Sequence, residues 1–452
     1  MINLSFIKSI RDLPTAPRRF LLFSCINLIS WQCIVGQVLI LFGRSIHMPS
    51  SWVGILISFL PLSLFLVIFS MSAVEKYGPR KVLIYTWLIR NLFASTVFAI
   101  PFAVNRWGEQ AAWHILLFAT LGFSMVRAFG VSAWFPWLHE VVPKSALGTY
   151  FAVETIISQA LTIVIMFAIA NILGMSGGAY RFYWVYFVGV TTGMISIFYI
   201  RRIPGGLSPP LEVAAHEKFS AILQALKDKK YKLFIFFIII SMSSIMWINV
   251  SSILYLRDIL GFSDTKIMIF MAFGAFGITL TVRYWSRHAE RYGSHKTMSI
   301  LIGAHSLIAF SWFAVIPDAS WTMPALPIII AGSVFSAGFS IVAYRGMMCL
   351  VPLENRVGYT SLWIVGISIA NGIPPIIAGK LIDLFQISGF RLCFLISGIC
   401  GILAAFLWNS FRIDDEDVPI SDIHLMIRPM QPLRSISRLV WMILTMKKKD
   451  NG

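Results

Sequence analysis

Arg127 and Glu154 are charged residues inside long apolar runs, where a charged side chain is costly unless it has a function or a partner. Arg127 lies in the run 112–138 and Glu154 in the run 148–173. A guanidinium can bind an anionic group through forked hydrogen bonds, and an enclosed carboxyl group can take up and release a proton as its access to water changes. These residues are therefore candidates for substrate binding and proton coupling. The structural alternative is an ion pair of Glu154 with Arg127 or Arg90.

A short charged segment occurs twice in the chain, as Glu75–Lys81 and as Glu290–Lys296, each time between two apolar runs. Both copies read acid, base, Tyr, Gly, any residue, base or His, Lys. Two later pairs of loop segments, including those around Arg181 and Arg391, repeat at nearly the same offset of about 210 residues. A constant offset through three loops indicates two copies of one membrane unit.

This turn resembles the motif G-x-x-x-D-[RK]-x-G-[RK]-[RK] that transporters of the major facilitator superfamily carry between the second and third helices of each half. Glu75 and Glu290 replace the motif's Asp, while Met71 and Ser286 replace its first Gly. The resemblance implies a gating function without any role in making bonds: the carboxylates lock the halves together in the outward-open state, the glycines permit the turn and the basic residues hold it at the inner surface. The residues implied are Glu75, Gly78, Arg80, Lys81, Glu290, Arg291, Gly293 and Lys296.

The segment Arg127–Gly130 resembles the family's R-x-x-x-G motif of the fourth helix, with the glycine one residue early, and in family members that arginine is associated with proton coupling. Members line a central cavity with helices 1, 4, 7 and 10. The resemblance thus implies a substrate site formed by Gln32, Arg127, Asn249, Tyr344 and Arg345. Arginines from opposite halves would favour an anionic group. The alternatives are that Arg345 forms an inner-gate ion pair and that some of the polar residues only join helices.

The composition of the chain requires a lipid environment, because 58% of the 452 residues are hydrophobic and only 13% are charged. A membrane-spanning helix needs about 20 mainly apolar residues. Twelve runs meet this requirement, at 20–43, 51–74, 82–104, 112–138, 148–173, 182–200, 233–256, 265–285, 297–316, 325–350, 358–384 and 390–411. The sequence predicts an all-α membrane protein with twelve transmembrane helices in two pseudo-symmetric six-helix bundles. The pair Pro374–Pro375 predicts a break or bend in the eleventh helix.

The net charge of +17 comes largely from basic residues in one set of loops. Positive residues favour the cytoplasmic side, so we expect both termini in the cytoplasm and a multi-pass protein of the cell membrane, either the inner or the plasma membrane. Attraction to the lipid bilayer then explains the charge without nucleic acid.

The chain divides by composition into five parts. They are a cytoplasmic N-terminus (1–19), an N-terminal six-helix bundle (20–200), a cytoplasmic linker with an amphipathic helix (201–232), a C-terminal six-helix bundle (233–411) and a cytoplasmic tail (412–452).

No Walker sequence, H-E-x-x-H, G-x-S-x-G or redox C-x-x-C motif occurs in the chain. We therefore expect no catalytic residue, metal or cofactor and no enzyme activity. We predict a monomeric secondary active transporter that moves a small organic solute, anionic or polar, by alternating access, coupled to H+. One alternative is a drug or lipid exporter of the same fold, and another is a transporter-like membrane sensor or scaffold.

Overall fold

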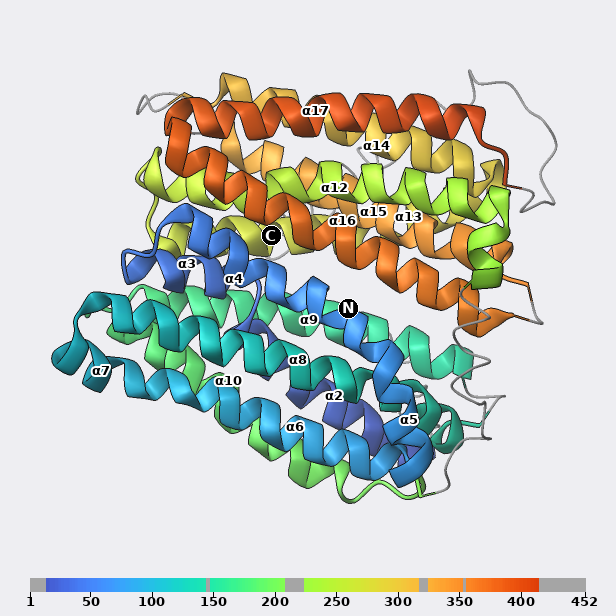
Figure 1. Ribbon diagram of the computed structural model, residues 1–452, viewed down its shortest axis with the longest axis horizontal. Coiled ribbons are helices and arrows are strands. Elements are labelled where there is room, and N and C mark those ends of the chain that lie inside the picture. Colours follow the sequence, from blue (N-terminus) through green and yellow to red (C-terminus); the bar gives the residue numbers. More distant parts are fainter. Residues whose placement is uncertain (1–13, 144–146, 208–222, 317–323, 353–354, 414–452) are drawn as a thin grey trace, which may run out of the picture.

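The computed structural model describes residues 14–143, 147–207, 223–316, 324–352 and 355–413, which form a bundle of long helices (Figure 1). The start of the predicted linker helix, before residue 223, and nearly all of the predicted tail lie outside these described residues, and residues 223–227 are helical.

Twelve helical units cross the bundle in alternating directions, and this confirms the predicted fold class. They are α2 (Thr15–Ile34) with α3 (Gln37–Ser45); α4 (Ser50–Ser63) with η1 (Leu64–Leu66) and α5 (Val67–Tyr77); α6 (Pro79–Ser95) with η2 (Thr96–Ala99) and α7 (Ile100–Trp107); α8 (Glu109–Val141); α9 (Leu147–Leu173); α10 (Tyr180–Ile200); α12 (Lys229–Asp258); α13 (Asp264–Tyr292); α14 (Ser294–Ser311) with η4 (Trp312–Ala314); α15 (Ala325–Leu350); α16 (Arg356–Phe385); and α17 (Ile387–Ser410). In the described chain, eleven units are long and apolar enough to span a membrane alone, and the remaining one is the unit of α4, η1 and α5, whose apolar stretch Ser50–Leu66 is shorter.

Because successive units run in opposite directions, their ends gather at two opposite ends of the bundle. The Thr15 end contains the start of α2 and the end of α17, and the Arg44 end contains the end of α3 and the start of α4. These two names are used below.

The helices form two halves, which occupy separate layers in Figure 1: α2 to α10 in blue to green, and α12 to α17 in yellow-green to red. The halves meet where α4 packs on α16 and α9 packs on α13. The first contact is unusually close, because a Cβ on Gly54 would lie 2.1 Å from the carbonyl oxygen of Pro375, and one on Gly379 would lie 2.2 Å from that of Ser50. Only glycine permits this contact between backbones.

The buried apolar residues show that the halves pack together at one end only. One hydrophobic cluster contains residues of both halves, such as Leu41 and Leu254 towards the Arg44 end. Two other clusters contain residues of a single half each, Trp137 in one and Trp408 in the other, towards the Thr15 end. The protein therefore has a closed Arg44 end, whereas the Thr15 ends of the two halves have separate cores.

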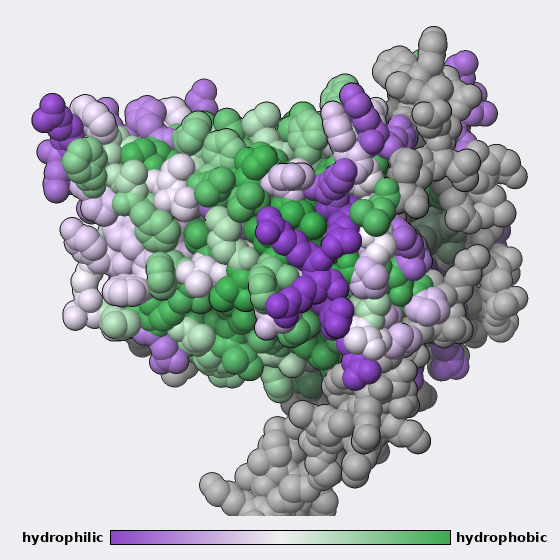
Figure 2. Space-filling model, turned by 90° about the horizontal axis from the view of Figure 1, so that it is seen from below, coloured by the Kyte–Doolittle hydropathy of each residue, from purple (hydrophilic) through white to green (hydrophobic). Residues whose placement is uncertain are grey.

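The outer surface of the bundle carries many large apolar side chains. Figure 2 shows one such face, on which apolar residues cover much of the surface and surround a hydrophilic group near the centre, with further hydrophilic residues at the left edge and near the grey atoms. Phe102, Trp184 and Phe406 are 70%, 60% and 71% exposed. A surface of this kind requires contact with lipid.

The two copies of the charged turn have the same backbone conformation. Gly78 has φ 79° and ψ 149°, and Gly293 has φ 83° and ψ 152°. Each glycine ends one helix and begins the next, and its positive φ explains why glycine occupies this place in both copies. The duplication inferred from sequence is thus present in the backbone.

The first copy of the turn also holds the beginning of the linker. The N–H of Arg80 donates to the carbonyl of Gly206 at 3.0 Å, and its Nη2 donates to the carbonyl of Arg201 at 2.6 Å. Glu140 at the end of α8 accepts the N–H of Gly206 at 2.8 Å. The linker therefore leaves the first half attached to the Thr15 ends of α6 and α8.

Two expectations about the continuity of helices differ from the structure. The first predicted helix, 20–43, is interrupted at Val35–Gly36, because Gly36 has φ 68° and ψ −132° and cannot continue a helix. By contrast, α16 continues through Pro374–Pro375 without a break.

At the Thr15 end, Asp228 caps α12 and joins it to α16. Its carboxylate accepts the N–H groups of Lys230 and Tyr231 at 2.9 and 3.1 Å and the hydroxyl of Tyr359 at 2.8 Å. Burial alone would raise the pKa of Asp228, but these hydrogen bonds and the charge of Lys230 together lower it below its ordinary value.

We expect Asp228→Ala to lower the free energy of unfolding by about 1–2 kcal/mol at neutral pH, because a capping carboxylate is lost. Because folding lowers the pKa of Asp228, its charged carboxylate adds stability at pH values above its ordinary pKa of about 3.9. This contribution disappears as the pH falls through the pKa of the folded state. The difference in thermal unfolding between wild type and variant should therefore shrink below about pH 4. Asn355→Ala removes the uncharged cap of α16 and is the control, because its effect should not depend on pH in this range. A constant deficit of Asp228→Ala down to pH 3 would contradict the charged cap.

Candidate functional site

The first membrane unit is broken in its middle, and the break opens onto free space. Its first part, α2, ends at Ile34, and Val35 is extended. Gly36 is exposed, and a Cβ placed on it would meet no atom within 4 Å. Non-helical backbone at membrane depth is tolerated where it lines a cavity.

A cavity of about 400 Å³ lies between the halves at this break. Its lining comes from α2, the break and α3, from α4 and η1, and from α8, α12 and α16. Most of the lining is apolar, and four polar side chains interrupt it: Gln37, Arg127, Asn249 and Asn371.

The polar side chains of the cavity have no hydrogen-bond or ion-pair partner among the residues that the structure describes. The guanidinium of Arg127 lies deep in the protein and stacks on the ring of Trp31, with 4.4 Å from Cζ to the ring centroid. Asn249 is exposed to the cavity, and Oδ1 of Asn371 is buried without a donor. Unpaired polar groups at this depth are costly, so their presence around one cavity indicates that a ligand or water completes them.

The predicted substrate-binding residues divide between the cavity and other places. Arg127 and Asn249 line the cavity. Gln32 instead donates to the hydroxyl of Thr162 in α9 at 3.4 Å, and the ring of Tyr344 packs on Trp363 of α16. These two side chains join helices within their own halves.

Arg345 is not part of the cavity lining. It precedes the end of α15 by five residues, whereas Arg127 precedes the end of α8 by fourteen. At about 1.5 Å per residue, Arg345 therefore lies about 14 Å nearer the Thr15 end than Arg127 does. The expected pairing of the two arginines around one site is absent from the described cavity.

A second arginine, Arg90, is buried near Arg127. Arg90 of α6 is only 1% exposed, donates to Oδ1 of Asn27 and stacks on Trp87 with 4.0 Å from Cζ to the ring centroid. Trp87 donates to the same oxygen of Asn27 at 2.9 Å. Arg90 also lies over the ring of Phe123, whose centroid is 6.4 Å from that of Trp31, so the two guanidinium groups occupy the same region of the first half.

Glu154 lies on α9 near Ser24 and Cys25 of α2 and near Tyr150, one turn away on its own helix. Among the ion pairs found in the described chain, none joins Glu154 to Arg127 or Arg90. The structure thus places this carboxyl group between two helices of the first half, nearer the Thr15 end than the cavity.

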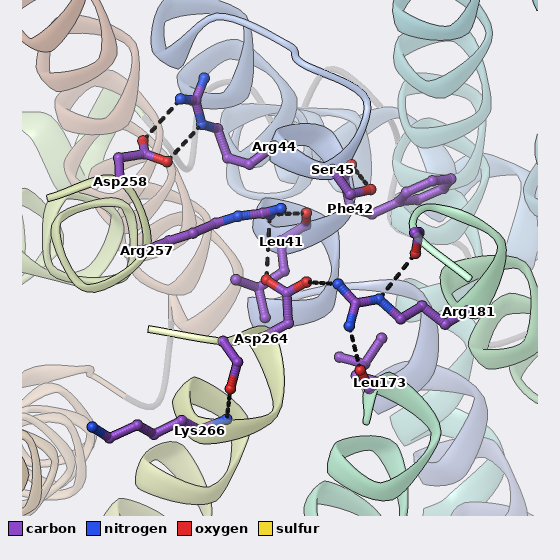
Figure 3. Close-up of polar contacts among 12 residues, drawn as sticks. Leu41, Phe42, Arg44, Ser45, Leu173, Arg181, Arg257, Asp258, Asp264 and Lys266 are labelled. Carbon is purple, nitrogen blue, oxygen red and sulfur yellow. Dashed lines mark hydrogen bonds and ion pairs between the residues drawn. The ribbon is translucent and has the colours of Figure 1, made fainter. Parts of the chain in front are cut away.

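The Arg44 end is closed by a polar network that joins the two halves (Figure 3). This Arg44 network consists of Arg44, Arg181, Arg257, Asp258 and Asp264. Arg44 pairs with Asp258 at 3.0 Å, and Asp264 pairs with Arg181 at 2.7 Å and with Arg257 at 3.4 Å. The side chain of Asp264 is only 3% exposed.

Backbone carbonyl groups complete the coordination of these arginines. Arg257 of the second half also donates to the carbonyl of Leu41 in the first half, and Arg181 donates to those of Leu173 and Gly178 (Figure 3). The network therefore ties the ends of α3, α9 and α10 to α12 and α13.

A further carboxylate joins α4 to α16 at the same end. Asp383 accepts the N–H groups of Ser50 and Ser51 at 2.9 and 2.7 Å. An acid at a helix N-terminus is stabilised by the unpaired N–H groups and the helix dipole. Asp383 thus caps a helix of the opposite half.

Sequence reasoning did not single out the three acids of this end, Asp258, Asp264 and Asp383. A signal was present, because acids follow or precede apolar runs at the end where Arg44 and Arg181 stand. The partner of each acid could not be read from the sequence, since Arg181 and Arg391 occupy repeated positions and only Arg181 has a described ion pair with an acid.

The predicted gating residues lie at the Thr15 end. Gly78 and Gly293 form the two turns, and Arg80 binds the linker as described above. Glu75 and Lys296 are partly buried, whereas Lys81, Glu290 and Arg291 are exposed. In this conformation Arg80 forms hydrogen bonds with the linker, through the carbonyls of Gly206 and Arg201.

Comparison with known proteins gives the family of the chain. A family model described as Major Facilitator Superfamily matches residues 20–348. A search of curated proteins found no match. Among solved structures, a mutant of the nucleoside transporter NupG is 14% identical with a TM-score of 0.69, covering 88% of this chain and 100% of its own.

A bacterial homologue of the iron transporter ferroportin is similar in two states. Its inward-facing structure is 15% identical with a TM-score of 0.68, covering 88% of this chain and 98% of that one. Its outward-facing structure with soaked iron is 16% identical with a TM-score of 0.60, covering 88% and 99%. At these identities the likeness concerns the fold.

Proposed function

Because the chain belongs to the Major Facilitator Superfamily, with a transporter's fold, we propose that it is a secondary active transporter that moves a small organic anion by alternating access. The observation that carries the proposal is Arg127, a guanidinium without a described hydrogen-bond or ion-pair partner in a cavity between the two halves. A cavity bounded by both halves can open to either side as the halves rock around it.

The distribution of charge supports an orientation with the Thr15 end in the cytoplasm of a cell membrane. Basic residues such as Arg19, Arg80 and Arg202 gather at this end. At the Arg44 end, the three arginines of the network are paired with two acids, which offset most of their charge. The positive-inside rule then makes the present conformation inward-facing, since the closed end faces outward. The higher TM-score against the inward-facing ferroportin homologue is in line with this assignment.

Proton coupling is the second part of the proposal, and Glu154 is its carrier. Its carboxyl group lies between α2 and α9, and α9 packs on the opposite half through α13. Rocking of the halves changes the access of this group to water, which allows it to take up a proton on one side and release it on the other.

Uptake into proteoliposomes under an imposed pH gradient tests the proposal. A panel of radiolabelled organic anions, neutral solutes and cations is supplied to wild type, to Arg127→Gln and to the control Arg106→Gln, which changes an exposed arginine of the same half. We expect uptake of an anion that falls at least tenfold in Arg127→Gln and stays unchanged in the control, because the charged contact is lost.

Other results would favour the rival functions. Transport of apolar cations that Arg127→Gln does not reduce would favour a drug or lipid exporter, which the largely apolar lining could serve. The complete absence of transport, with a folded protein, would favour a sensor or scaffold.

A further inference from the structure

We infer that the anionic group of the substrate binds at the exposed N-terminus of α3, opposite Arg127, and that the substrate is a monoanion with an apolar body. This inference rests on the proposed function and names the part of the cavity that recognises the charge. It assigns the break in the first membrane unit a binding role.

The N-terminus of α3 offers unpaired hydrogen-bond donors to the cavity. The helix has nine residues and begins at Gln37. The first N–H groups of a helix have no partner within it, and no acceptor is found in the described protein for those of Gln37, Val38 and Leu39. The exposed Gly36, with open space beside it, leaves the approach to these donors clear. The partial positive charge of a helix N-terminus adds to their attraction for an anion.

Arg127 is the second, independent element of this site. It lines the same cavity as Gly36 and Gln37, although it comes from α8. Its guanidinium places one face on Trp31, which belongs to the last turn of α2 before the break. Stacking uses the face of the guanidinium, so the N–H groups at its edge remain available for a forked contact with two oxygens.

The two elements lie close together because Trp31 connects them. The N–H of Val35, the residue before Gly36, donates to the carbonyl of Trp31 at 3.1 Å. The break thus comes one helical turn after Trp31, and Arg127 stacks on the ring of that residue. A carboxylate between them would accept bonds from both, and the second guanidinium, that of Arg90, lies in the same region.

The lining also limits the charge and shape of the substrate. Arg127 is the only ionisable side chain in the lining of the described cavity, so a second negative charge would remain unpaired and costly. Trp31, Ile57, Leu60, Met246 and Val250 offer an apolar surface for the rest of the molecule. Asn249 and Asn371 can bind a polar substituent. These features fit a carboxylate attached to a flat or branched apolar group.

Equilibrium dialysis of the purified full-length protein with radiolabelled benzoate tests the inference. Benzoate is a monoanion with an apolar ring, benzamide is its neutral analogue and phthalate carries two charges. We expect wild type to bind benzoate at least tenfold more tightly than benzamide or phthalate, because only benzoate satisfies the donors without adding an unpaired charge.

Two variants at one position separate the backbone donor from the side chain. Gln37→Pro removes the N–H at the first position of α3, where proline is compatible with a helix, and Gln37→Ala removes the same side chain but keeps the N–H. Benzoate should bind Gln37→Pro about tenfold more weakly than Gln37→Ala, with benzamide unaffected by the difference. Arg127→Gln should weaken the binding of benzoate by a similar factor. This test does not depend on whether α3 accepts proline at position 37.

Equal affinity of wild type for benzoate and benzamide would overturn the inference, as would equal affinity of folded Gln37→Pro and Gln37→Ala for benzoate. Uptake of anions that depends on Arg127 but not on the N–H of Gln37 would leave the proposed function intact and remove the α3 site. Benzoate binding with the expected differences, but without transport of any anion, would retain the site and remove the proposed function.

Discussion

Replacing Asp264 with alanine is expected to open the Arg44 end and to shift the protein away from the conformation described here. Asp264 is the shared partner of Arg181 in one half and Arg257 in the other, and it is almost completely buried. Removing one partner from a buried pair costs about 3–5 kcal/mol, because the remaining charge is left uncompensated. Both arginines are about one-fifth exposed and keep backbone carbonyl partners, so the cost here is nearer about 2–3 kcal/mol. This corresponds to a roughly 30- to 150-fold change in the ratio of closed to open molecules.

Distances between spin labels can measure this change. Labels on cysteines at Arg106 and Ile387, both exposed and on opposite halves at the Arg44 end, should move apart in Asp264→Ala, in a background without the five native cysteines. Arg181→Ala should produce the same displacement. Arg391→Ala is a matched control, because Arg391 occupies the repeated position in the second half, is exposed and has no ion pair with an acid among the described residues. Unchanged distances in both Asp264→Ala and Arg181→Ala would show that the network does not hold the end closed.

Glu154→Gln is expected to abolish accumulation of substrate against its gradient while exchange across the membrane continues. Glutamine has the shape of the protonated carboxyl group but cannot release a proton, so net coupled transport stops after one half-cycle. Exchange requires no net release of a proton and should persist. We expect at least a tenfold loss of accumulation driven by the pH gradient, with exchange within about twofold of wild type.

The control for this substitution is Glu109→Gln. Glu109 is an exposed carboxylate in the first turn of α8, so its replacement changes charge without touching the space between α2 and α9. Accumulation by Glu154→Gln at the level of wild type would eliminate the coupling role. A parallel loss of accumulation, exchange and folded yield would indicate that Glu154 only stabilises the contact between its two helices.

The sequence by itself determined the class of the protein, its number of membrane helices and its duplication. Each follows from a local rule: an apolar run must become a helix because lipid offers no hydrogen bonds to the backbone, and the run's length decides whether it spans. The repeated glycines, Gly78 and Gly293, could be recognised because a tight turn with positive φ requires that residue wherever it occurs. Arg127 could be identified because a charge within an apolar run is costly in any arrangement of the helices.

The tertiary structure alone decided which of these residues meet. Gln32 and Asn249 are both polar residues in apolar helices, yet Gln32 faces Thr162 within its own half and Asn249 faces the cavity. The rotation of each helix about its axis sets this difference, and it depends on packing such as the backbone contact of Gly54 with Pro375. The partners Arg181 and Asp264 lie 83 residues apart, so no local pattern joins them. The break at Gly36 became a binding feature only because folding placed it at a cavity beside Arg127, where unpaired N–H groups can face a ligand instead of lipid.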